Sequence, residues 1–350
     1  MQKLFREFNI KNVKMKNRIC IPPMVVGFSN DGSVTPENVE RYKKLAQGGA
    51  GLIIQEATCI NIDGKLSGNQ LGMWADEQIE GLKRIVDVVH QENCPIFIQI
   101  HHAGVVGISE NPLCPSDYEY KKNEKTVIGR EMTIEDIKSI QNDYIQAARR
   151  AYEAGYDGIE LHGCHGYLIS QFLNKRVNKR TDEYGTNPEN FVIEILDGIR
   201  KITPKEFVVG IRLGGFEPTI EDGVHYAKVL ERNGIDFFDI SYGFANEQEM
   251  KVPEGYKYSN AVYAAERIKE EVSVPVFAVN GIYSAETAEE ILNERDIDMV
   301  DIARGALINP NWANDAKEGK DTGKCLSCAK CMWFGQSKVC AGKVLFERNN

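Results

Sequence analysis

The sequence has no long apolar run, and this absence excludes several cellular roles. No stretch of the 350 residues approaches about 18 uninterrupted apolar residues, the length that a membrane-spanning helix needs. The N-terminal segment 1–19 carries scattered charges and lacks an apolar run of signal-peptide length. We therefore expect a cytoplasmic protein that does not act at a membrane.

An excess of positive charge is also missing. The chain has 42 Lys and Arg residues against 51 Asp and Glu residues, which gives a formal net charge of −9. An acidic chain is not attracted to nucleic acid or to an anionic membrane surface. A small molecule is the expected partner, and a tRNA-modifying or RNA-binding function is disfavoured.

Low-complexity tracts, short repeats and Pro/Gly-rich linkers are absent, so one large domain is expected. Short apolar segments instead recur eight times, near residues 20, 54, 98, 160, 210, 240, 277 and 301. Amphipathic segments with helical spacing lie between them. This alternation predicts an α/β fold, a (β/α)8 TIM barrel. We assign the barrel to residues 1–318 and expect the segment 105–132 to cross the barrel mouth.

Polar residues at the carboxyl ends of the strands are the candidates for chemistry, because TIM barrels gather their active sites there. The stretch IELHGCHGYLISQFL, residues 159–173, reads as a strand end, a sharp turn with two glycines and the start of a helix. It contains His162, His165 and Tyr167. A zinc site would need a third ligand, which we do not find in this stretch. The strand-end position favours a catalytic role.

The last two expected strands end in glycine followed by a helix. Their end residues are Asn280–Gly281 and Arg304–Gly305. Backbone N–H groups and a helix N-terminus in this arrangement can hold a phosphate, and Arg304 would add positive charge. The sequence therefore predicts a phosphate-bearing ligand.

Two other polar stretches are expected to have structural rather than catalytic roles. Successive strand residues face opposite sides, so one of His101 and His102 should point inward near the site, and we expect neither to be catalytic. The segment NKRVNKR, residues 174–180, is expected to be a solvated basic loop.

Cysteine is sparse except in one cluster near the end of the chain. Five of the nine cysteines are scattered, as is typical of reduced thiols in a cytosolic protein. The other four, Cys325, Cys328, Cys331 and Cys340, follow one another with regular spacings of x2, x2 and x8. This regularity predicts a metal site in a separate segment, residues 319–350. Four thiolates suit either a [4Fe–4S] cluster or structural zinc, and the spacing alone does not separate the two.

Eight motifs occur in a fixed order along nearly the whole chain: NRICIPPM, IIQEAT, IQIHHAG, AGYDGIELHGCHGYLISQFL, NKRTDEYG, VGIRL, VNGI and DIARGALINPNW. In these motifs the chain resembles the Old Yellow Enzyme group of FMN-dependent ene-reductases. The resemblance implies reduction of the C=C bond of an enone or enoate, with hydride supplied by the flavin. It also implies that His162 and His165 hold the substrate carbonyl and that Tyr167 donates the proton.

The resemblance further implies which residues hold FMN, from the flavin ring to the phosphate. Those positions are Pro23, Met24, Val25, Ala57, Gln99, Arg212, Asn280, Gly281, Ala303, Arg304 and Gly305. Three positions depart from the common pattern. Val25 stands where many relatives carry Cys or Thr, Gly27 where some carry Tyr, and Val105 where an Arg is common.

Relatives of the trimethylamine dehydrogenase and dienoyl-CoA reductase type carry an iron–sulfur cluster after the eighth strand. The resemblance therefore favours [4Fe–4S] over zinc for the four clustered cysteines, although the last spacing in those relatives is longer than x8. No FAD/NAD domain is evident, so NAD(P)H, a reduced ferredoxin or a partner flavoprotein is expected to supply electrons. Amine demethylation and a pure electron-transfer role remain alternatives, and a homo-oligomer is expected.

Overall fold

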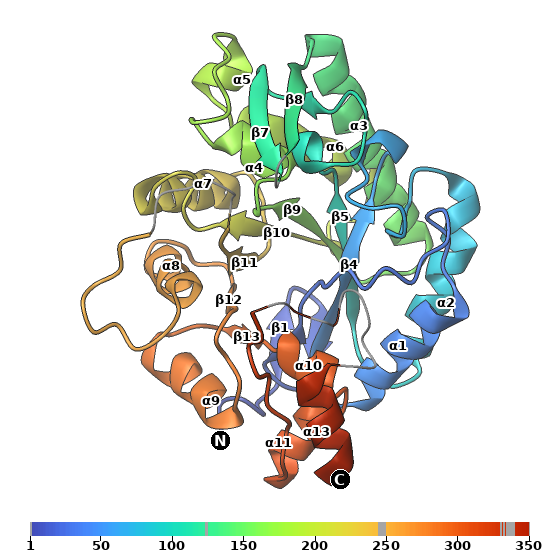
Figure 1. Ribbon diagram of the computed structural model, residues 1–350, viewed down its shortest axis with the longest axis vertical. Coiled ribbons are helices and arrows are strands. Elements are labelled where there is room, and N and C mark those ends of the chain that lie inside the picture. Colours follow the sequence, from blue (N-terminus) through green and yellow to red (C-terminus); the bar gives the residue numbers. More distant parts are fainter. Residues whose placement is uncertain are drawn as a thin grey trace.

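The computed structural model describes residues 2–122, 125–243, 250–329, 331, 333 and 340–349. Eight parallel strands close into a barrel in the order β10-β11-β12-β13-β3-β4-β5-β9 (Figure 1). The predicted (β/α)8 barrel is confirmed, and each predicted apolar segment is one of its strands. They are β3 (Ile19–Ile21), β4 (Leu52–Cys59), β5 (Ile96–His101), β9 (Gly158–Gly163), β10 (Val208–Gly214), β11 (Phe238–Ser241), β12 (Val276–Ala278) and β13 (Met299–Asp301).

Helices surround the barrel because each presents one apolar face to the strands. The longer ones are α1 (Pro36–Gln47), α2 (Ile79–His90), α3 (Ile134–Glu153), α6 (Asn190–Ile202), α7 (Ile220–Arg232), α8 (Asn260–Lys269) and α9 (Ala285–Glu294). Shorter pieces are α4 (Leu168–Leu173), α5 (Glu183–Thr186), α10 (Arg304–Ile308), α11 (Trp312–Glu318), α13 (Ala341–Asn349) and the turns η1 (Ile62–Gly64), η2 (Asp76–Gln78) and η3 (Gly104–Val106). In the described part of the chain, none of the helices has the length and apolarity to span a membrane.

A short antiparallel hairpin, β1 (Phe8–Ile10) and β2 (Val13–Met15), precedes the barrel. Its apolar side chains join those at the starts of the barrel strands in one buried cluster. The hairpin therefore closes the amino-terminal end of the barrel and leaves the carboxyl ends of the strands for ligands. The cluster consists of Ile10, Val13, Met15, Cys20, Leu52, Ile54, Phe97, Val208, Phe237, Phe277 and Met299.

The long insertion after β5 forms a small sheet of its own, with β6 (Leu113–Cys114), β8 (Lys125–Glu131) and β7 (Tyr118–Lys122) in that order. In Figure 1 this sheet and helix α13 lie at opposite ends of the molecule. Side chains of the insertion pack in a cluster that includes Tyr167 at its edge. The insertion therefore adjoins the barrel mouth beside one of the predicted catalytic residues.

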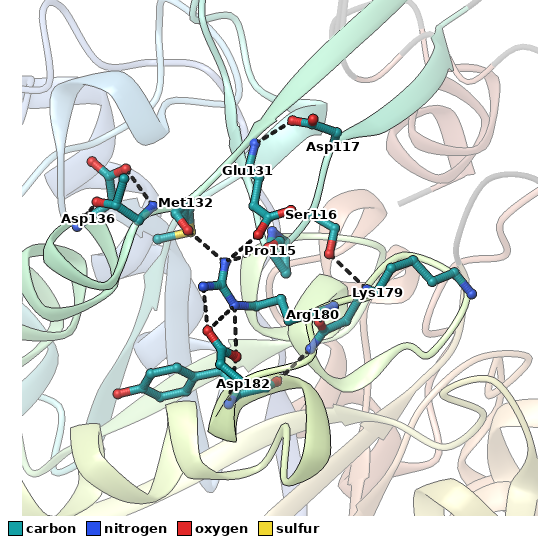
Figure 2. Close-up of polar contacts among 12 residues, drawn as sticks. Pro115, Ser116, Asp117, Glu131, Met132, Asp136, Lys179, Arg180 and Asp182 are labelled. Atoms are coloured by element: carbon teal, nitrogen blue, oxygen red, sulfur yellow. Dashed lines mark hydrogen bonds and ion pairs between the residues drawn. The ribbon is translucent and has the colours of Figure 1, made fainter.

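The basic segment after α4 is not a solvated loop at Arg180, so that prediction is wrong for this residue. The Arg180 side chain is only 6% exposed. Its guanidinium donates to the carbonyls of Pro115 at 2.8 Å and Met132 at 2.6 Å, and it pairs with Asp182 at 2.6 Å (Figure 2). Arg180 thus ties both ends of the insertion to the barrel, because those backbone carbonyls need donors.

Candidate active site

A cavity of about 460 Å³ lies at the carboxyl ends of the barrel strands. It brings together the residues predicted to bind the flavin ring and the three residues predicted to be catalytic. Val26, Gly27, Leu66 and Ser67 complete its wall. The predicted residues that line it are Pro23, Met24, Val25, Ala57, Gln99, His162, His165, Tyr167 and Arg212.

The register of three strands explains why these polar side chains meet. Gln99 of β5 is the register partner of Glu160 in β9, and Arg212 of β10 is the partner of His162 in β9. Partners in adjacent parallel strands share a side of the sheet, and residues two apart on one strand share it as well. All four side chains therefore point into the barrel, where Gln99 Nε2 donates to Glu160 Oε1 at 2.7 Å.

Arg212 is buried beside three carboxyl groups. Its Nη1 lies 2.9 Å from Asp239 Oδ2 and 3.9 Å from Asp301 Oδ2, and Glu160 is close by. Burial lowers the pKa of the guanidinium, but Asp239 and Asp301 raise it by more, so Arg212 stays charged. Its Nε nevertheless has no hydrogen-bond partner among the described residues.

A buried donor without an acceptor is costly, so this N–H group calls for a ligand with acceptor atoms. The pyrimidine end of a flavin carries carbonyl oxygens and ring nitrogens of that kind. The side chains present at this point of the cavity therefore fit the flavin that the sequence resemblance implies.

The turn between β9 and α4 aims the catalytic candidates into the cavity. His165 (φ 62°) and Gly166 (φ 71°) are successive residues in the left-handed region, and the carbonyl of Gly166 accepts from Gln171 Nε2 at 2.6 Å. Of the two glycines in this stretch, only Gly166 makes the turn. Gly163 ends the strand, where a Cβ atom would lie 2.8 Å from the side chain of Ile211. A left-handed histidine is uncommon.

A chain of close contacts connects three imidazoles and one hydroxyl group. The Nδ1 atoms of His101 and His162 are 3.0 Å apart, and His162 Nε2 is 3.0 Å from His165 Nδ1. His165 Nε2 is 2.8 Å from Ser241 Oγ. The ring of Tyr167 packs edge-on against His101, with centroids 4.5 Å apart. His101 is thus the inward-facing residue of its pair, and it contacts the site directly.

Burial keeps the three imidazoles neutral and the tyrosine protonated. It lowers the pKa of His101 and His165 to about 3 and that of His162 well below its ordinary value. It raises the pKa of Tyr167 to about 12. At neutral pH each imidazole therefore carries one N–H, and Tyr167 keeps its hydroxyl proton, so the site offers uncharged hydrogen-bond donors.

Cys164 supplies a third ligand atom that our sequence reasoning overlooked in this stretch. The ligand atoms of His162, Cys164 and His165 lie within 4.8 Å of one another, the one such group found among the described residues. Burial raises the pKa of the Cys164 thiol well above its ordinary value, so the thiol keeps its proton. Metals bind the thiolate, so a metal at this group would have to displace that proton.

A second cavity, of about 170 Å³, holds most of the predicted phosphate residues. Asn280, Gly281, Ala303 and Arg304 line it, together with Ser241. Arg304 donates a hydrogen bond to the hydroxyl group of Tyr283, which also lines this cavity. Since Ser241 contacts His165 of the first cavity, the two cavities adjoin, and a ligand with a ring at one end and a phosphate at the other could occupy both.

Gly305 does not line the second cavity. It is buried in α10, where a Cβ atom would lie 3.0 Å from the ring of Trp312. The glycine therefore serves packing between α10 and α11, and the neighbouring backbone, not Gly305, faces the cavity.

The four clustered cysteines precede α13 in the chain, and all four are among the described residues. Cys328 and Cys331 are exposed, while Cys325 and Cys340 are partly buried. Among the described residues, no three of these sulfur atoms form a group within 4.8 Å of one another. The N–H of Ser327 points at Cys325 Sγ, 3.5 Å away, a contact that stabilises thiolates in iron–sulfur sites.

A family model and two relatives cover nearly the whole barrel. The model of the NADH:flavin oxidoreductase / NADH oxidase family matches residues 3–322. An NADPH dehydrogenase of Geobacillus sp. (strain WCH70) is 37% identical over 335 residues, which cover 93% of this chain and 96% of that protein. An NADH oxidase of Thermoanaerobacter brockii is 37% identical over 346 residues. This match covers 93% of the chain but only 52% of the relative, so the chain spans about half of its length.

Solved structures agree with this relationship. An old yellow enzyme homologue from Zymomonas mobilis matches with a TM-score of 0.79 and 25% identity over 95% of this chain and 96% of its own. Morphinone reductase in complex with tetrahydroNAD matches with a TM-score of 0.78 and 25% identity over 93% of each chain. The chain therefore belongs to the NADH:flavin oxidoreductase / NADH oxidase family, the Old Yellow Enzyme family of flavin-dependent oxidoreductases.

Proposed function

We propose that this protein binds FMN and reduces a C=C bond conjugated to a carbonyl group. The observation that carries the proposal is a shared cavity: His162, His165 and Tyr167 line the same space as Gln99 and Arg212. Hydrogen-bond donors for a substrate thus face the space where a flavin ring would lie. FMN, when bound, supplies a hydride from N5 to the β-carbon of the substrate.

The two cavities would divide the cofactor between them. Arg212 and the amide of Gln99 would bind the pyrimidine end of the ring in the larger cavity, and Arg304 with the Asn280–Gly281 backbone would hold the phosphate in the smaller one. The charge of Arg212 would favour the negative charge that reduction places on the flavin. Ser241, between the cavities, is close enough to His165 to link the cofactor site to the substrate site.

The catalytic residues would act as uncharged donors. His162 and His165 would hold the carbonyl oxygen and stabilise the negative charge that develops there as hydride arrives. Tyr167, whose pKa of about 12 keeps it protonated, would give a proton to the α-carbon. Neutral donors can do this because a hydrogen bond to the oxygen strengthens as negative charge develops on it.

We propose NAD(P)H as the electron donor. The relatives named NADH oxidase and NADPH dehydrogenase and the tetrahydroNAD complex of morphinone reductase support a nicotinamide at this site. A nicotinamide ring and an enone would bind in turn over the same flavin face. The substrate pocket is mostly apolar, with Leu66, Val26 and Met24 in its wall, which favours a substrate with an apolar body around its conjugated carbonyl.

We propose a [4Fe–4S] cluster for the four clustered cysteines. A cubane places each thiolate on a different iron atom, so its sulfur ligands lie farther apart than those of one zinc ion. The four thiolates that the spacings x2, x2 and x8 supply are the ligand set of such a cluster. The segment 319–350 would then hold a redox centre at the edge of the barrel.

Anaerobic purification followed by a visible spectrum and by flavin, iron, sulfide and zinc analysis tests both cofactors together. We expect one non-covalent FMN per chain and about four iron and four sulfide per chain. A protein that holds no flavin after reconstitution with FMN would refute the proposed function. Stoichiometric zinc without iron would refute the cluster and leave the flavin reaction in place.

A further inference from the structure

We propose that His101 is a positioning residue that sets the tautomer of His162, so that His162 presents an Nε2–H donor to the substrate carbonyl. The inference rests on the proposed function, in which His162 binds that oxygen. It adds a residue of β5 to a site whose substrate donors come from the end of β9 and the turn that follows it.

His101 is fully buried and does not line the cavity, so it acts on the substrate through neighbouring side chains, of which His162 is the one it contacts through a ring nitrogen. Its Nδ1 lies 3.0 Å from Nδ1 of His162, and Nε2 of His162 faces His165 on the cavity side. One proton must lie between the two Nδ1 atoms for this contact to be a hydrogen bond. Because each neutral imidazole carries a single N–H, the owner of that proton decides which nitrogen of His162 is protonated.

Two arrangements of protons satisfy the chain of contacts. In the first, His101 donates from Nδ1, His162 donates from Nε2 to His165, and His165 donates from Nε2 to Ser241. In the second, every bond is reversed, and the chain starts from the hydroxyl proton of Ser241. Only the first arrangement gives His162 an N–H on the side of the cavity.

Nε2 of His101, the ring nitrogen that does not contact His162, distinguishes the two arrangements of protons. His101 Nε2 is buried and has no hydrogen-bond partner among the described residues. The first arrangement leaves a lone pair at that atom, whereas the second leaves an N–H group without an acceptor. Buried N–H groups without partners are rarer in native proteins than under-satisfied acceptors. The chain therefore runs from His101 toward Ser241.

This direction prepares both histidines for a carbonyl oxygen. The protons that His162 and His165 can offer are then on Nε2, and their acceptors in the free site are His165 Nδ1 and Ser241 Oγ. A carbonyl oxygen replaces these acceptors without any change of tautomer, so no proton has to move before binding. Donors that already have the required tautomer stabilise the transition state without reorganisation as negative charge develops on the oxygen.

Nitrogen-15 NMR of histidine-labelled protein tests the assignment directly. Two-bond correlations between ring protons and ring nitrogens distinguish the tautomers, and only six histidines need to be assigned. We expect His101 to be protonated at Nδ1 and His162 at Nε2. A wild-type His162 that is protonated at Nδ1 would overturn the proposal, and this measurement needs no variant.

A matched pair of variants separates hydrogen bonding from space filling. Asn and Leu have similar shapes, but only His101→Asn keeps a side-chain N–H near the position of Nδ1. We expect His101→Leu to lose the single His162 tautomer and to weaken binding of a phenol, measured by its charge-transfer band with the flavin, on the order of tenfold. His101→Asn should keep the single His162 tautomer and the wild-type affinity for the phenol. Equal phenol binding by the Leu and Asn variants, with His162 unchanged, would refute the role of His101.

These outcomes remain distinct from a failure of the proposed function. A wild-type protein that reduces an enone but carries His162 protonated at Nδ1 would overturn only the role of His101. A protein with the expected tautomer that reduces no activated alkene would refute the ene-reductase activity and leave the direction of the hydrogen-bond chain intact.

Discussion

At the residue scale, burial decides the chemistry of each side chain in the site. The residue types at the strand ends predicted His162, His165 and Tyr167, because an enzyme barrel places its reactive groups there. Their protonation states could not be predicted, since these depend on desolvation by neighbours distant in sequence. The roles of His101 and Cys164 were missed for a related reason: which side a strand residue faces depends on the register of the adjacent strand.

Replacement of Tyr167 by Phe tests the proton donor. The ring and its edge-on contacts with His101 and His162 should survive, but the hydroxyl proton is lost. We expect reduction of the flavin by NAD(P)H to remain near the wild-type rate. Reoxidation by an enone should slow by about 10²–10⁴, the usual effect of losing a general acid. Stopped-flow absorbance of the two half-reactions measures both rates.

Tyr242, after the sixth barrel strand, provides the matched control for this experiment. Tyr242→Phe removes the same hydroxyl group from a residue that does not line the cavity beside His162. We expect its half-reactions to match the wild type. If Tyr167→Phe reoxidises at the wild-type rate while Tyr242→Phe is slow, the proton comes from Tyr242 instead.

Glu56 gives the protein a pH-dependent stability that can be measured. Its carboxylate accepts from the N–H of Val26 at 3.0 Å and from the hydroxyl of Tyr42 at 3.3 Å. Burial raises its pKa from 4.5 to about 7, although those contacts and Arg41 act in the opposite direction. Between these two values the native state holds a proton that the unfolded chain has lost, so the free energy of unfolding falls as pH rises.

We expect this contribution to be fully present below pH 4.5 and lost by about pH 7, a change on the order of 3 kcal/mol. Urea unfolding at pH 5 and pH 8 measures it, with Glu56→Gln as the comparison, because the amide cannot titrate. The wild type should lose more stability between the two pH values than the variant does. Equal losses in both proteins would show that Glu56 does not hold the extra proton.

At the element scale, periodicity in the sequence predicted the barrel strands and most helices. The register between neighbouring strands then brings the side chains of the site together. The apolar segments were recognisable because each is buried on both faces and bounded by turns. The hairpin β1–β2 could not be predicted in the same way, since three-residue strands are too short to show an alternation. Arg180 was mistaken for a solvated residue because its acceptors are backbone carbonyls of the insertion, about which the side-chain pattern says nothing.

The turn after β12 and the start of α10 should supply the phosphate site, and Arg304 is its cation. We expect Arg304→Ala to weaken FMN binding by about 1.5–3 kcal/mol, the range for a hydrogen bond to a charged group. Titration of apoprotein with FMN, followed by quenching of flavin fluorescence, measures the effect. Arg267 on α8 is 41% exposed and pairs with Glu270, so Arg267→Ala is the control and should bind FMN normally. Unchanged FMN affinity in Arg304→Ala would show that the phosphate does not bind at Arg304.

The C-terminal cysteines can be tested without disturbing the barrel, because they follow its last strand. We expect Cys328→Ser and Cys331→Ser to lose iron and the broad absorbance that underlies the flavin bands, while FMN is retained. The segment around them should become more susceptible to protease, since metal binding and local folding are coupled at such sites. Cys114→Ala, at a buried position of the insertion, should keep its iron. Iron retained in both cluster variants would exclude these cysteines as ligands.

At the scale of the whole molecule, the order of motifs indicated the family, and the closed barrel with its two adjoining cavities agrees with it. The identity of the substrate could not be predicted in this way. Its pocket is walled by the loops after β3 and β4 and flanked by the insertion, and loop shape depends on packing between distant segments.

The most direct measurement is an anaerobic single turnover with an activated alkene. The FMN-reconstituted protein is reduced with one equivalent of NADPH and mixed with 2-cyclohexenone, while the flavin absorbance is followed and the product is identified. We predict that the oxidised flavin spectrum returns with formation of one equivalent of cyclohexanone. A flavin that stays reduced in the presence of enones and enoates, yet is reoxidised by oxygen, would contradict the proposed reaction.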